Sequence, residues 1–210
     1  MTEAEWLDCN DAGVMLEFLW QCQGIQPRDI DLRFNVREWT PAVEAVASLD
    51  RQLHRFYLAS CRKIWRLLPQ EESRDGVALA EQYLAGKVTW EEVNRFNWFV
   101  EGAAFTIDYN TEPANLNFWV EEVRAIPKAE LGTILYPPEI ALEIEPRELL
   151  QRAAYFVDYA MIYPNLRPKG PPPKSYYPFL SADLLREFVG NPFRRAGHSS
   201  DKTSLPPQQP

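Results

Sequence analysis

The chain has 210 residues, of which 46% are hydrophobic, 25% charged and 13% aromatic, and this composition is typical of a globular protein. Its formal charge of −8 disfavours general binding to nucleic acid or to anionic membranes, and its three cysteines are too few for a disulfide scaffold. The apolar content excludes a disordered chain, and the length suits one domain, or one domain with an appendage.

Two short helices are predicted at the N-terminus. Thr2 and Glu5 have the spacing of a capping box, in which the hydroxyl accepts from the backbone at Glu5 while the carboxylate reaches back. Asp11 is expected to cap a second helix, which Gly24 ends before a loop over residues 24–39. The apolar residues that recur at helical spacing in this second helix are Val14, Met15, Phe18, Leu19 and Cys22.

The clearest amphipathic segment runs from a helix start at Thr40-Pro41 to Pro69, as one long helix or as two with a break near residues 48–50. Its apolar face is predicted to be buried and holds Leu53, Phe56, Tyr57, Ser60, Ile64, Leu67 and Leu68. At 100° per residue, the opposite face carries four arginines within about 60° of each other, with a lysine beside them. These five cations, which we name the basic row, are Arg51, Arg55, Arg62, Lys63 and Arg66.

Four more helices are predicted before residue 164. They cover residues 71–84, a segment opened by a capping box at Thr89 and Glu92, residues 116–126 and a segment that begins at Pro146. The buried side of the second is predicted to hold Val93, Phe96, Phe99, Val100 and Ala103. The buried stripe of the fourth is predicted to hold Leu149, Leu150, Ala153, Phe156, Val157 and Ala160. Residues 108–114 are predicted to form a loop, and residues 133–136 are too few to assign.

Much of the proline lies near the C-terminus, with six prolines between residues 164 and 178. Residues 164–180 are predicted to form an extended strap across the helices, with residues 171–173 in polyproline II, and the alternative is a ligand for an aromatic groove. Ser181 is expected to open a last helix that ends with a left-handed stop at Gly190. Residues 194–210 are predicted to be disordered.

No segment alternates apolar and polar residues as a half-buried strand does, so the predicted fold is all-α. We expect an irregular multi-helix bundle or a short α-solenoid-like array, with the proline-rich strap and a disordered C-terminal tail. The helical body is predicted to span residues 1–163, and the terminal helix, within residues 181–193, is predicted to pack on this body.

Three stretches carry a resemblance to a known group of proteins. They are the start MTEAEWL, the helix around Cys61 with its Cys–Arg/Lys–x–Trp pattern, and the box DLLREFVGNPFR over Asp183–Arg194. In this combination the chain resembles a group of uncharacterised bacterial proteins. The resemblance implies no activity, because none is established for that group, and it assigns no functional residue.

No arrangement of residues in the sequence indicates catalysis or a bound cofactor. The cysteines and His54 lack the spacing of zinc ligands, and we interpret the cysteines as small core residues, namely Cys9, Cys22 and Cys61. Cys61 and His54 would lie about 10 Å apart along their helix, which is too far for a nucleophile and its base. Tryptophans on helix faces are interpreted as core residues, namely Trp65, Trp90, Trp98 and Trp119. We therefore predict no catalytic, cofactor or metal residue.

The charge is unevenly distributed along the chain. Residues 1–50 carry −7 and residues 69–150 carry −10, whereas residues 51–68 carry +5 and the last sixty residues carry +4. The basic row is the one concentrated feature, and its five residues are the candidate partner-binding residues. The alternative interpretation is a solvated helix face, paired with the acidic N-terminal region.

We hypothesise a non-enzymatic, cytoplasmic module that binds a protein partner of complementary charge. The alternatives are an acidic inhibitor or immunity-type protein, an enzyme of unrecognised type, and a protein that binds nucleic acid through the Arg51–Arg66 helix face. Nucleic acid is disfavoured because the body around the basic row is acidic. The start lacks the basic and apolar regions of a signal peptide, and no apolar run reaches the ~18 residues of a membrane helix.

Overall fold

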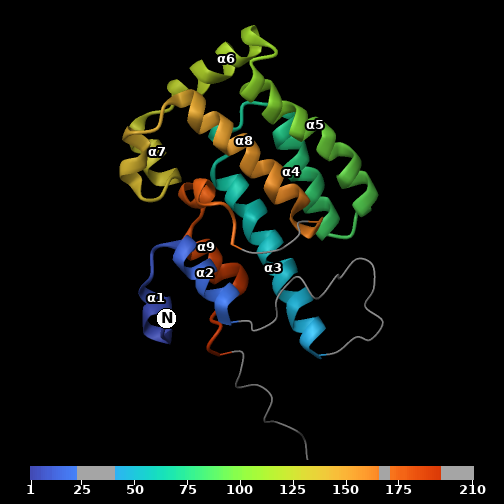
Figure 1. The fold of residues 1–210 in the computed structure, drawn as a ribbon, viewed down its shortest axis with the longest axis vertical. Coiled ribbons are helices and arrows are strands. Elements are labelled where there is room, and N and C mark those ends of the chain that lie inside the picture. Colours follow the sequence, from blue (N-terminus) through green and yellow to red (C-terminus); the bar gives the residue numbers. More distant parts are fainter. Residues whose placement is uncertain (23–40, 166–170, 195–210) are drawn as a thin grey trace, which may run out of the picture.

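The computed structural model describes residues 1–22, 41–165 and 171–194, and this part of the chain forms helices and no strand (Figure 1). The predicted all-α fold is confirmed. Within these residues, no helix is long and apolar enough to cross a membrane. The predictions of a loop at 24–39, of a cap at Thr40 and of disorder after Arg194 fall outside the described residues.

The described residues form α-helices and short 3₁₀ turns. The α-helices are α1 (Glu3–Asp8), α2 (Ala12–Cys22), α3 (Pro41–Lys63), α4 (Glu71–Leu84), α5 (Trp90–Tyr109), α6 (Pro113–Arg124), α7 (Lys128–Ile134), α8 (Pro146–Ile162) and α9 (Ala182–Val189). Short 3₁₀ turns accompany them, namely η2 (Trp65–Leu67), η3 (Pro138–Leu142), η4 (Tyr163–Asn165) and η5 (Lys174–Phe179).

The helix starts are fixed by the side chains that the sequence predicts. The Thr2–Glu5 and Thr89–Glu92 capping boxes are both present, at the starts of α1 and α5. Asp11 accepts hydrogen bonds from the backbone of Gly13 and Val14, at 2.8 and 3.1 Å, and so caps α2. These bonds satisfy backbone donors that a helix start leaves unpaired, which is why such local signals locate it reliably.

The structure differs from the prediction at several helix boundaries, including that of α6, which spans Pro113–Arg124 instead of residues 116–126. Helix α3 is one continuous helix, but it ends at Lys63 and the chain tightens into the turn η2 instead of remaining α-helical to Leu68. Helix α5 extends two residues into the predicted loop and ends at Tyr109, and within this extension Asp108 accepts hydrogen bonds from Gln151 and Tyr155 of α8. Helix α7 has seven residues, too few to produce a recognisable period. At the stop after α9, Gly190 has φ 75° and ψ −162°, so its φ is positive but its conformation is not left-handed helical.

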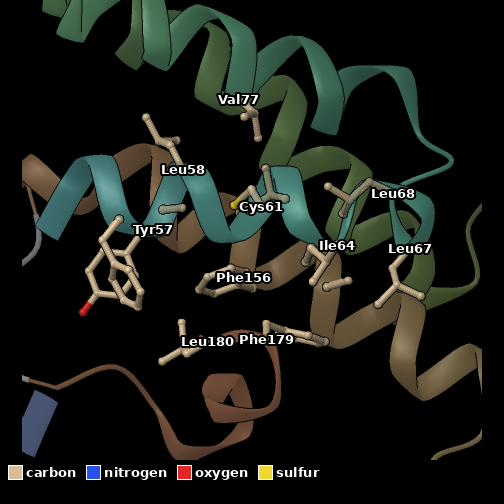
Figure 2. Close-up of a cluster of buried hydrophobic side chains, with 14 of the residues drawn as sticks. Tyr57, Leu58, Cys61, Ile64, Leu67, Leu68, Val77, Phe156, Phe179 and Leu180 are labelled. Carbon is tan, nitrogen blue, oxygen red and sulfur yellow. The ribbon is translucent and has the colours of Figure 1, made fainter. Parts of the chain in front are cut away.

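The core forms around α8, which packs against α3, α4, α5 and α6 (Figure 1). The predicted apolar faces of α3 and α8 are both buried. Figure 2 shows the centre of this core, where side chains of α3, α4, α8 and the strap meet, including Tyr57, Cys61, Val77, Phe156 and Phe179. A Cβ on Gly76 would lie 2.4 Å from Met161 Sδ and 2.5 Å from Val100 Cγ2, so this glycine permits the close packing of α4 on α5 and α8.

The proline-rich segment after residue 170 lies against α2, α3 and α8 through the turn η5. The ring of Tyr177 covers Gly13, where a Cβ would lie 2.1 Å from the ring. The Tyr177 hydroxyl donates to the Glu17 carboxylate at 3.0 Å. On the other side, the backbone N–H of Tyr136 donates to the carbonyl of Pro178 at 2.9 Å. These contacts lead the chain back across the body to the start of α9.

Candidate functional site

A groove of about 910 Å³ lies between α3, α4 and α9. Its apolar lining, which we name the floor, is formed by Leu58, Ala59, Leu84, Ala85, Leu184 and Phe188. Its edges are charged and are formed by Arg55, Arg62, Lys63, Glu81, Asp183 and Glu187. An apolar floor with a few polar groups along the edges is the usual character of a binding site.

The groove brings together three residues of the basic row and leaves two outside. Arg55, Arg62 and Lys63 line it. Arg51 is exposed on α3 outside this lining. Arg66 leaves the row because the backbone changes from α-helix to 3₁₀ turn after Lys63. Its guanidinium instead pairs with Glu130 of α7, at 3.4 Å.

Arg62 is held in place by contacts within the protein. Its Nε and Nη2 donate to the two carboxylate oxygens of Glu81 on α4, at 2.9 and 2.5 Å. Its guanidinium carbon lies 4.2 Å from the centre of the Trp65 ring. The hydrogen bonds to Glu81 raise the pKa of Arg62 above its ordinary value. Arg62 therefore ties α3 to α4. The ion pairs of Arg62 with Glu81 and of Arg66 with Glu130 reduce the positive charge that the basic row offers to phosphates.

Arg55 and Lys63 are the groove cations without an ion pair among the described residues. Arg55 is exposed, whereas Lys63 is half-buried. Burial lowers the pKa of Lys63, and the charge of Asp183 across the groove opposes this effect. The α3 wall thus presents two cations, and the α9 wall presents the carboxylates of Asp183 and Glu187.

The three stretches that carry the resemblance meet at α9, beside the groove. Arg186 donates to the backbone carbonyls of Trp6 and Cys9 at the end of α1, and to the carboxylate of Asp183. The ring of Phe193 stacks on Phe18 of α2, with 5.5 Å between ring centres. Helix α9 also packs along α3, which carries the central motif. These contacts connect α1 and α2 to α9, and the groove is lined by Asp183, Leu184, Glu187 and Phe188 of α9.

The residues considered for metal binding or nucleophilic chemistry do not form a site. Cys61 is buried in the core, and burial raises the pKa of its thiol above the ordinary range. His54 is buried between the rings of Tyr83 and Tyr163, with 6.3 and 6.2 Å between ring centres. Among the described residues, no three His, Cys, Asp or Glu side chains are grouped as metal ligands would be.

The sequence interpretation missed two surfaces. The groove, which Leu184 and Phe188 line, was not predicted, because a periodic apolar pattern cannot distinguish a groove floor from a core. On α5, Phe99 and Trp98 were predicted to be buried, and this is wrong: their exposed fractions are 59% and 74%. Helix α5 has aromatic residues on both faces, so its apolar period does not identify the inner one.

Asp158 of α8 is a titratable group outside the groove, near Asn97 and Glu101 of α5. The Oδ1 atoms of Asp158 and Asn97 are both buried without a hydrogen-bond partner in the described part of the chain. The pKa of Asp158 is raised to about 6, mainly by burial and to a smaller extent by the charge of Glu101, while the Asn97 side chain has an opposite, weaker effect. The folded protein therefore holds a proton on Asp158 more strongly than the unfolded chain does.

Relative to an Asp158→Asn variant, the wild type is expected to lose stability as the pH rises from 4 to 7. The unfolded carboxyl loses its proton near its ordinary pKa of 3.8, whereas the folded one keeps it up to about pH 6. Above pH 6 the ionised group destabilises the fold by up to about 3 kcal/mol, and Asp158→Asn removes that cost. Urea unfolding of both proteins across this pH range measures the difference, and a constant difference would contradict the raised pKa.

Comparison of the chain with protein-family models, with curated proteins and with solved structures finds no match. Membership of the bacterial group therefore stays a prediction, and the site is interpreted from its own geometry.

Proposed function

We propose that this protein is a non-enzymatic, cytoplasmic module that binds an amphipathic helical segment of a protein partner in the α3–α4–α9 groove. The observation that supports this is an apolar floor bordered by Arg55 and Lys63, two cations without an ion pair among the described residues. A half-buried lysine beside an apolar surface favours an anionic partner, because a neighbouring carboxylate offsets the cost of burying the ammonium group.

The charges along the two walls select the orientation of the segment. Arg55 and Lys63 on α3 face acidic residues of the partner, and Asp183 and Glu187 on α9 face basic ones. Apolar residues at positions i, i+3, i+4 and i+7 of the partner helix fill the floor. Such a segment carries acids along one edge and bases along the other, and a segment with the charges reversed is repelled.

The experiment compares two matched double variants in affinity capture from a lysate of the source organism. Arg55→Glu with Ala85→Glu places two acids in the groove, at exposed positions that the fold does not need. The control is Arg51→Glu with Ala125→Glu. Arg51 and Arg55 are both exposed arginines of α3, and Ala125 and Ala85 are the exposed C-caps of α6 and α4. The control therefore makes the same two substitutions outside the groove.

A partner of this groove is retained by the wild type and by the control, and its recovery falls at least about tenfold with the groove variant. Hydrogen exchange of the purified complex should then show slower exchange in α3 and α9. The proposal is overturned if the wild type retains no stoichiometric protein, or if both double variants retain the same proteins equally.

A further inference from the structure

The outer face of α5 carries a row of exposed aromatic side chains away from the groove. The exposed fractions of Trp98, Phe105 and Tyr109 are 74%, 40% and 69%. At 100° per residue these three lie within about 40° of each other, and Phe99 lies on the same broad face. Figure 1 shows α5 at the outer edge of the array, with α4 and α8 on its inner side. Exposed aromatic side chains grouped along one helix face in this way indicate an interaction site.

Gly102 lies in the middle of this row, and no contact among the described residues explains it. A Cβ added to Gly102 would meet no atom within 4 Å, in contrast to the buried Gly76. Glycine is one of the least favourable residues inside a helix, so an exposed one at mid-helix needs a reason outside the monomer. The approach of a second helix backbone supplies that reason, since a residue without Cβ lets two helices come close.

We infer that this face binds a second copy of the same chain, with the two α5 helices antiparallel and crossing at Gly102. A two-fold axis through Gly102 places residue i of one copy opposite residue 204 − i of the other. Phe99 then lies opposite the second copy's Phe105. Arg95 then lies opposite the second copy's Tyr109, and the same two contacts repeat on the other side of the axis.

The charges of α5 fit this antiparallel arrangement. Arg95 is the one basic residue of α5 and is exposed. The arrangement brings it to the C-terminal end of the facing helix, where the second copy's Tyr109 presents its ring and where Glu112 and the helix dipole add negative charge. A parallel pair would instead place each Arg95 beside its own counterpart and align the two dipoles. This inference concerns a different surface from the groove and does not depend on the proposed function.

The first test measures association by sedimentation velocity over a wide range of protein concentration. The wild type is expected to dimerise, and Gly102→Leu is expected to weaken the dimer at least about tenfold, because the new side chain fills the crossing point. Gly102→Leu should fold as well as the wild type, since open space surrounds the position and leucine favours helix. The inference is overturned if the wild type stays monomeric throughout, or if Gly102→Leu dimerises as strongly.

The second test fixes the register by cysteine cross-linking under mild oxidation, with the wild type as the background control. Gly102→Cys lies on the two-fold axis, so its thiols are expected to form an intermolecular disulfide. In Thr106→Cys the two cysteines are displaced by about 12 Å along the helices, which is beyond the reach of a disulfide. Cross-linking of both variants would indicate a parallel pair, and cross-linking of neither would exclude this crossing point, so either result overturns the inference.

Discussion

Replacement of Phe156 with alanine is expected to lower the free energy of unfolding by about 3–5 kcal/mol. Phe156 is fully buried on α8, at the centre of the cluster in Figure 2. Its ring lies 5.6 Å from that of Phe179 and 5.5 Å from that of Tyr176 in the strap, and 6.4 Å from that of Tyr57 on α3, measured between ring centres. The truncation leaves a cavity among these rings, and the surrounding helices cannot close it fully.

The measurement is urea unfolding followed by circular dichroism, with Phe118→Ala as the control. Phe118 is 61% exposed on α6, so its truncation should change the unfolding free energy by less than about 0.5 kcal/mol. Because the strap rests on Phe156, Phe156→Ala should also speed proteolysis within residues 171–180. A loss below about 1.5 kcal/mol would contradict the packing of the strap against α8.

Replacement of Arg186 with alanine is expected to lower the free energy of unfolding by about 2–4 kcal/mol. The guanidinium donates to the carbonyl of Trp6 through Nε and Nη2, both at 3.3 Å, and also to the carbonyl of Cys9. These are carbonyls at the C-terminal end of α1, which lack partners inside their own helix. Loss of the guanidinium leaves them unsatisfied and releases α1 from α9.

Two controls separate this role from charge alone. Arg186→Lys keeps the charge but cannot reach both carbonyls with a rigid fork, so its loss should be intermediate. Arg194→Ala removes an exposed contact with Glu3, at 3.2 Å, and should cost less than about 1 kcal/mol. Hydrogen exchange should become faster in α1 and α2 of Arg186→Ala while α8 remains protected. Unchanged exchange in α1 would show that Arg186 does not hold it.

The helices were predictable where local chemistry determines them. The caps at Thr2, Asp11 and Thr89 act within one turn, so their effect is visible in the sequence. Helix α8 was predicted correctly because one face is buried along its whole length. The inner face of α5 was not predicted correctly, because the packing of α4 and α8 decides which of its aromatic residues are covered.

The candidate site depends on contacts between distant segments, and this limits its prediction. The basic row was placed on one helix face by angles alone, but the chain leaves the α-helix after Lys63 and carries Arg66 away. The acid that pairs with Arg62 comes from α4, and the second wall of the groove comes from α9, more than a hundred residues later. No local pattern contains these pairings.

The hydrogen bonds from Arg186 of α9 to the carbonyls of α1 have a consequence for synthesis on the ribosome. Helices α1 and α2 carry buried apolar side chains such as Trp6 and Leu16, but the segment with Arg186 and Phe193 that holds them is made about 180 residues later. At a translation rate of 5–20 residues per second, roughly 10–30 s pass between the synthesis of α1 and that of α9. During that interval the apolar side chains of α1 and α2 are not yet buried, and a ribosome-bound chaperone is suited to cover them. The helices α1 and α2 are thus made well before the segment that locks them in place.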